Sequence, residues 1–77
     1  MRYAYKMSVK VGTTKQAVVD FGVKDTLSEV VKYADSCGIG TSEKLIADTI
    51  ANFGKYTHTM RVPREVGHRR LVVVEMR

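Results

Sequence analysis

The chain has 77 residues, enough for one small folded domain, and we expect a single domain over residues 1–77. Hydrophobic residues make up 44% and charged residues 27% of the chain, a balance that excludes a disordered protein. The formal net charge of +5 at pH 7 favours an acidic partner over a basic one.

The sequence lacks the features expected of a membrane or secreted protein. No apolar run approaches the roughly 20 residues that a membrane-spanning helix needs. The alternating polar and apolar residues at the N-terminus also differ from a signal peptide. Cys37 is the one cysteine, so an internal disulfide is impossible, whereas small secreted domains usually depend on such bridges. We therefore expect a cytoplasmic protein without a membrane partner, located in the host cytoplasm if it is viral.

Alternating side chains predict two strands at the start of the chain. Residues 3–11 alternate without a fault, and residues 17–23 resume the alternation after a short loop. Val18 alone breaks the second pattern. We therefore expect a β-hairpin whose buried face carries the apolar residues Tyr3, Tyr5, Met7, Val9, Val11, Ala17, Val19, Phe21 and Val23.

The middle of the chain changes to helical spacing. Thr26 and Glu29 form a capping box that predicts the start of a helix, and Gly38 predicts its end. A second helix is predicted to open at Thr41-Ser42 and to end at Gly54. Each helix has an apolar stripe that is expected to face the core. The core residues predicted from these two stripes are Val31, Leu45, Ile46 and Ile50.

Two further strands are predicted near the C-terminus. Residues 55–62 alternate again, and Pro63 ends that strand because proline cannot donate to the ladder. A basic loop is expected up to Arg69, before an apolar run in which Val72 and Val74 complete the predicted core. The order ββααββ predicts an α+β fold, a four-stranded antiparallel sheet with two short helices on one face.

Charge is distributed unevenly over these elements. Residues 1–24 and 54–77 each carry a net charge of +4, whereas residues 25–53, which hold both helices, carry −3. We therefore expect an acidic helical side and a basic uncovered face of the sheet. The residues predicted on that basic face are Arg2, Lys6, Lys10, Lys24, Lys55, Arg61 and Arg77.

The densest basic segment, residues 61–70, is the main candidate for a binding site. Guanidinium groups suit carboxylates and phosphates, and small scaffolds often place function in loops. A solvated turn is the alternative interpretation. The predicted partner-binding residues are Arg61, Arg64, His68, Arg69 and Arg70, together with Arg2, Lys6, Lys10 and Lys55.

Other kinds of site have less support in the sequence. The aromatic strand residues share the predicted buried register, so base stacking on the uncovered face is not expected unless that register is inverted. No pair among Cys37, His58 and His68 has metal-ligand spacing, and no phosphate-binding glycine motif is present. His68 has no evident partner for acid–base catalysis. We predict no cofactor, no metal and no enzymatic activity.

These features predict a small non-enzymatic binding protein. We expect an accessory or inhibitory module, of the kind that phages produce, whose basic surface engages a nucleic-acid-handling protein complex. Two alternatives remain open. One is direct, sequence-nonspecific binding to nucleic acid, and the other is a structural homo-oligomer such as a homodimer.

Overall fold

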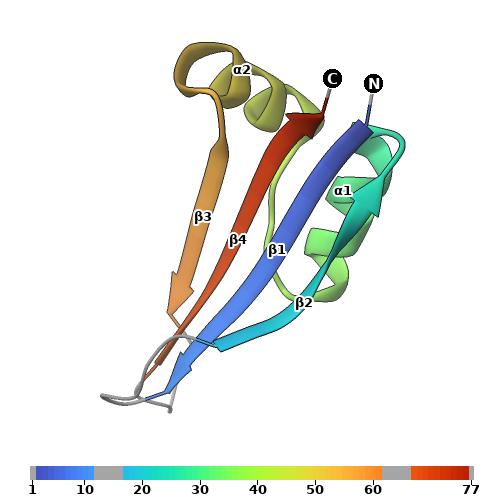
Figure 1. The fold of residues 1–77 in the computed structure, drawn as a ribbon. Coiled ribbons are helices and arrows are strands. Elements are labelled where there is room, and N and C mark those ends of the chain that lie inside the picture. Colours follow the sequence, from blue (N-terminus) through green and yellow to red (C-terminus); the bar gives the residue numbers. More distant parts are fainter. Residues whose placement is uncertain (1, 12–16, 62–66, 77) are drawn as a thin grey trace.

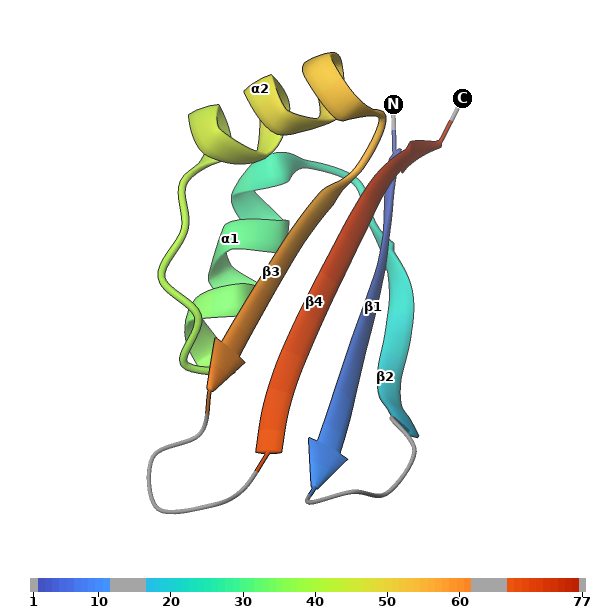
Figure 2. The same ribbon diagram turned by 90° about the vertical axis from the view of Figure 1, so that its left-hand side faces the viewer.

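The framework of the molecule is one antiparallel sheet. The computed structural model describes residues 2–11, 17–61 and 67–76 (Figure 1). Within these ranges the strands lie in the order β2-β1-β4-β3, and both helices lie on the same side of the sheet (Figures 1 and 2). The predicted α+β fold is therefore confirmed. The elements are β1 (Arg2–Val11), β2 (Ala17–Lys24), α1 (Leu27–Ser36), α2 (Glu43–Phe53), β3 (Tyr56–Arg61) and β4 (Gly67–Met76).

Both helices begin and end as the sequence predicts. The side-chain oxygen of Thr26 accepts a hydrogen bond of 3.2 Å from the backbone N–H of Glu29, and Ser42 caps α2 in the same way. Each bond satisfies an N–H that has no acceptor within the helix. Gly38 and Gly54 follow the two helices with a φ of 82°, in the left-handed region that favours glycine.

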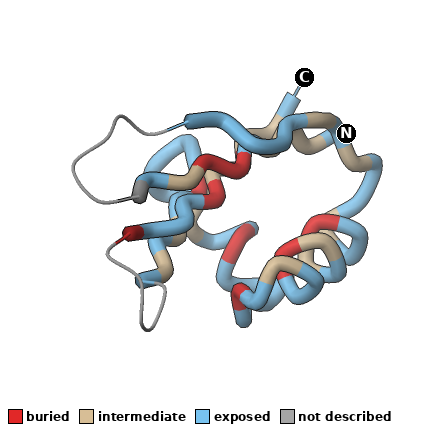
Figure 3. The backbone as a smooth tube through the Cα atoms, turned by 90° about the horizontal axis from the view of Figure 1, so that it is seen from below, coloured by how far each residue is buried: buried red, intermediate tan, exposed pale blue. Residues whose placement is uncertain are grey.

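The core lies between the sheet and the two helices, and both layers contribute buried residues (Figure 3). Ile46 is buried as predicted, and Val31 and Ile50 pack against the core while partly buried. The Tyr56 hydroxyl, at the edge of the core, donates a hydrogen bond of 2.9 Å to Thr41. The buried core residues are Met7, Val30, Ala34, Ile39, Ile46, Tyr56, Leu71 and Val73.

Three apolar residues predicted for the core lie outside it for simple geometric reasons. Leu45 is 49% exposed, because it is adjacent to Ile46 on α2 and neighbouring helical residues point in different directions. Val72 and Val74 alternate along β4 with the buried Leu71 and Val73, so they lie on the opposite face of the sheet and are only half-buried.

Strand β2 contains a β-bulge that the sequence analysis missed. Met7 of β1 is opposite Asp20, but the next residue, Ser8, is opposite Val18. Val19 is therefore an extra residue on β2, and an extra residue reverses the faces on which the following side chains lie. The fault in alternation at Val18 coincides with this bulge.

The bulge moves the apolar residues of β2 out of the predicted core. Phe21 lies opposite Lys6, and Val23 lies opposite Ala4, both on the face turned away from the helices. Phe21 is 76% exposed, Val19 60% and Val23 46%. The prediction that these residues are buried is wrong, because it assumed the same register along all of β2 despite the exception at Val18.

Strand β4 is longer than predicted. It begins at Gly67 and pairs with β1 over its whole length, so His68, Arg69 and Arg70 are strand residues rather than loop residues. Backbone pairing does not depend on side-chain polarity, and all three side chains are exposed. The predicted loop residue Arg64 lies outside the described residues.

Substitution of two leucines distinguishes the observed core from the predicted one. Leu71 is 0% exposed, whereas Leu45 is 49% exposed. We expect Leu71→Ala to lower the free energy of unfolding by about 2–5 kcal/mol, because it leaves a cavity in the core. Leu45→Ala removes the same atoms from a solvated site and should cost clearly less. Urea denaturation measures both values, and equal losses would contradict the observed packing.

Candidate binding surfaces of the sheet

The face of the sheet turned away from the helices is the first candidate surface, which we call the open face. Strand pairing and alternation define its membership. It comprises Arg2, Ala4, Lys6, Ser8 and Lys10 of β1, Val18, Phe21 and Val23 of β2, Thr57, Thr59 and Arg61 of β3, and His68, Arg70, Val72, Val74 and Met76 of β4.

The half of the open face nearest the chain termini holds most of its apolar side chains, beside Arg2 and Lys6 of β1. Val23 and Val74 flank Ala4 in one cross-strand row, and Phe21 and Val72 flank Lys6 in the next. We call Phe21, Val23, Val72, Val74 and Met76 the apolar end of the open face. Phe21 and Met76 are exposed, at 76% and 42%, so this end presents apolar side chains to solvent. Such a patch, bordered by charge, is typical of an interaction surface.

The opposite half of the open face is basic. Lys10, His68 and Arg61 form one cross-strand row, and Arg70 stands in the neighbouring row between Ser8 and Thr59. We call Lys10, Arg61, His68 and Arg70 the basic end. All four side chains are exposed. The structure thus brings together six of the predicted site residues on one face, namely Arg2, Lys6, Lys10, Arg61, His68 and Arg70.

Two of the other predicted site residues, Arg69 and Lys55, do not join this surface. Arg69 lies on the helix side of β4, and its guanidinium donates a hydrogen bond of 3.2 Å to the carbonyl oxygen of Cys37. Lys55 is exposed in the connection between α2 and β3. The predicted site residue Arg64, and Arg77 of the predicted basic face, lie outside the described residues. Arg2, which lies opposite Met76, forms an ion pair of 3.5 Å with Asp25, so part of its charge is compensated.

Lys24 lies on the helix side of the sheet, and its predicted place on the open face is wrong. It is opposite Tyr3, and its ammonium nitrogen lies 5.7 Å from the ring centre of Tyr5 and 5.8 Å from that of Tyr33. A cation over an aromatic ring is attracted by the negative face of the ring. The bulge at Val19 is again the reason, because it reverses the faces of β2.

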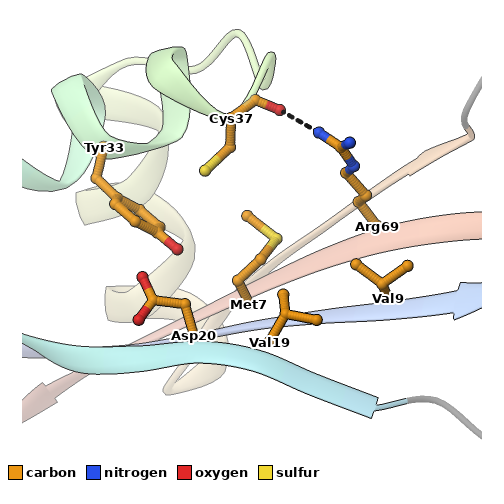
Figure 4. A pocket seen from close by; sticks show the side chains of 7 residues that line it. All are labelled: Met7, Val9, Val19, Asp20, Tyr33, Cys37 and Arg69. Atoms are coloured by element: carbon orange, nitrogen blue, oxygen red, sulfur yellow. Dashed lines mark hydrogen bonds between the residues drawn. The ribbon is translucent and has the colours of Figure 1, made fainter.

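The second candidate surface is a pocket on the helix side, between the C-terminal end of α1 and the sheet (Figure 4). It has a volume of about 310 Å³. We call it the helix-side pocket. Apolar side chains form much of its lining, and one acidic and one basic residue face it from different strands. The lining residues are Met7, Val9, Val19, Asp20, Tyr33, Cys37 and Arg69.

Two tyrosines surround the acidic side of this pocket. The Tyr5 hydroxyl donates a hydrogen bond of 3.3 Å to Asp20, and the rings of Tyr5 and Tyr33 have centres 4.4 Å apart. Burial, followed by the nearby Asp20 carboxylate, raises the pKa of both phenols above the ordinary value of 10.0. Both hydroxyls therefore remain protonated to a higher pH than a free phenol would, and the Tyr5 hydroxyl keeps its proton for the hydrogen bond to Asp20.

Gly22 allows the Tyr5 ring to lie directly against β2. The two residues are opposite each other, and a Cβ atom at Gly22 would lie 2.9 Å from the Tyr5 hydroxyl oxygen. The ring therefore occupies the space that a side chain on β2 would fill. An aromatic residue opposite a glycine in the neighbouring strand indicates this kind of packing. The sequence shows such a pair only once the register of the hairpin is known.

Comparisons with protein-family models, with curated proteins and with solved structures found no match. In the described part of the chain, no helix combines the length and apolar character needed to cross a membrane. The same residues contain no group of three or more His, Cys, Asp or Glu side chains placed to hold a metal ion. The candidate surfaces must therefore be interpreted from their own chemistry.

The raised tyrosine pKa values predict a loss of stability at alkaline pH. The stabilising contribution of these phenols is complete below their ordinary pKa of 10.0 and is lost as pH rises above it, because the unfolded chain releases the protons first. We expect Tyr33→Phe to show a shallower alkaline decline in the free energy of unfolding than the wild type. Urea denaturation over a pH series measures this, and parallel declines would contradict the assignment.

Proposed function

We propose that the protein is a small non-enzymatic binding module that engages an acidic protein surface through the open face. The observation that carries the proposal is the exposed Phe21 at the apolar end, on the same face as the exposed basic end. A face of this kind can use two forces at once. Apolar contact removes Phe21 and its neighbours from water, while the basic end attracts and orients an acidic partner.

The composition of the open face favours a protein over a nucleic acid as the partner. Protein interfaces combine an apolar centre with arginine and aromatic residues. Platforms for single-stranded nucleic acid usually present several aromatic rings for base stacking. Among the described residues, Phe21 is the one aromatic side chain assigned to the open face besides the imidazole of His68. The remaining apolar positions are aliphatic or Met76 and pack better against protein side chains.

A module of this size acts on larger machinery by occupying a surface. We propose a nucleic-acid-handling protein complex as that machinery, with an accessory or inhibitory effect and a cytoplasmic setting. The support for this narrower part is the net charge of +5, since a basic module is attracted to places where acidic surfaces gather.

Charge reversal at the basic end tests the proposal. We expect Lys10→Glu, Arg61→Glu and Arg70→Glu together to abolish retention of the acidic partner in pull-downs from nuclease-treated lysate, because each change replaces attraction with repulsion. Folding should be little affected, since all three side chains are exposed. The matched control reverses Glu29, Asp35 and Asp48 on the helices to Lys. Loss of binding in the control, with binding kept in the first variant, would contradict the proposal. It would indicate that the acidic helical side is the binding surface.

Direct binding to single-stranded nucleic acid is the second candidate, because the bulge places Phe21 on the open face opposite Lys6. This arrangement pairs a stacking surface with a cation for phosphate. If it operates, affinity for a labelled single-stranded oligonucleotide should fall linearly with salt on logarithmic axes, and Phe21→Ala should weaken it by about 1–3 kcal/mol. Fluorescence anisotropy measures both. Unchanged affinity in Phe21→Ala would remove base stacking from this candidate.

The third possibility, a homo-oligomer, stays a prediction. Measuring the mass of the protein in solution tests it. It is compatible with the proposed function, because a dimer joined elsewhere would leave the open face accessible.

A further inference from the structure

The helix-side pocket carries two opposite charges on different strands. Asp20 of β2 and Arg69 of β4 both line it, and β1 lies between these strands. Within the described residues, Asp20 forms no ion pair with Lys or Arg, and Arg69 forms none with Asp or Glu. Asp20 accepts from the neutral Tyr5 hydroxyl, and Arg69 donates to the neutral Cys37 carbonyl. Both contacts orient a charged group without cancelling its charge.

Between these charges the floor of the pocket is apolar. Met7 and Val9 stand on β1, and Val19 stands at the bulge of β2 (Figure 4). Met7 is buried and forms a fixed base, whereas Val19 is 60% exposed. A ligand in the pocket would therefore meet a carboxylate on one side, a guanidinium on the other and hydrocarbon below.

The spacing of the charged residues follows from the sheet. Asp20 is opposite Met7, and Arg69 is opposite Val9, on the two strands that flank β1. Their backbones are thus two strand spacings, about 10 Å, apart across the sheet, and the offset from Met7 to Val9 adds two residues, about 7 Å, along the strands. Side chains that lean over the pocket shorten this distance, but a ligand must still span several bonds to reach both charges.

We propose that the helix-side pocket binds a small zwitterion whose ammonium and carboxylate groups are separated by a short aliphatic chain. The ammonium lies against Asp20, the carboxylate lies against Arg69, and the chain covers Met7, Val9 and Val19. A simple amine would be repelled by Arg69, and a simple carboxylate would be repelled by Asp20. A purely apolar ligand would leave both charges uncompensated. Of these ligands, only the zwitterion matches the carboxylate, the guanidinium and the apolar floor of the pocket at once.

This site is separate from the proposed function. The pocket opens on the helix side of the sheet, whereas the acidic partner would bind the open face. Either proposal can therefore fail without affecting the other.

A titration followed by two-dimensional amide NMR tests the pocket, with ε-aminocaproate as the probe. Hexylamine, caproate and hexanol have a chain of the same length but lack one or both charges. We expect saturable, millimolar binding of ε-aminocaproate with shifts at Met7, Val9 and Asp20, and binding of the other three weaker by roughly three- to five-fold or more, since exposed charge pairs contribute modestly. Equal binding of all four probes, or no saturable shift with any, would overturn the proposal.

Two variants assign the charges to their residues. Asp20→Asn should weaken ε-aminocaproate binding by roughly three- to five-fold and improve binding of caproate, because the repulsion is removed. Arg69→Gln, which keeps an amide donor for the Cys37 carbonyl, should do the reverse and favour hexylamine. The control Arg70→Gln changes a cation on the open face and should leave all affinities unchanged. Wild-type affinities in both pocket variants would overturn the assignment, and the probe series on the wild type tests the site even if a variant fails to fold.

Discussion

Between Val18 and Asp20, strand β2 holds one residue more than the segment of β1 that faces it. Beyond this bulge the faces of β2 are reversed, so Phe21 points away from the helices and Asp20 points toward them. Both candidate surfaces depend on this reversal. Without it the open face would lose its exposed aromatic residue, and the helix-side pocket would lose its carboxylate.

The open face is organised along the strands rather than across them. Apolar rows near the chain termini give way to basic rows at the far end of β1 and β4, with Lys6 at the boundary. A partner that matches this order must carry its apolar and acidic groups in the same sequence, so the arrangement specifies orientation as well as attraction. The helical side of the molecule differs from the open face in charge, because residues 25–53, which hold both helices, carry a net negative charge.

The parts of the fold that could be predicted are those set by local interactions. The caps at Thr26 and Ser42 depend on hydrogen bonds within four residues, so the sequence alone locates both helices. The bulge depends on how β2 pairs with β1, a non-local choice. The faces of Lys6 and Lys10 followed from unbroken alternation in β1, and their assignment to the open face was therefore possible. The predicted position of Arg69 in a loop is wrong. The dense positive charge of residues 61–70 is typical of a loop, but the backbone from Gly67 onward is part of β4.

Strand β2 is the one strand of the described sheet that contributes no buried side chain. Main-chain hydrogen bonds to β1 and the Tyr5 ring over Gly22 hold it in place. Segments with so little burial open at low free-energy cost, so its amide protons should exchange with solvent before those of β4. Detachment of β2 would remove Phe21 and Asp20 from their surfaces together. A ligand bound at either surface would favour the attached state, and the two opposite sides of the sheet would become thermodynamically coupled through the strand they share.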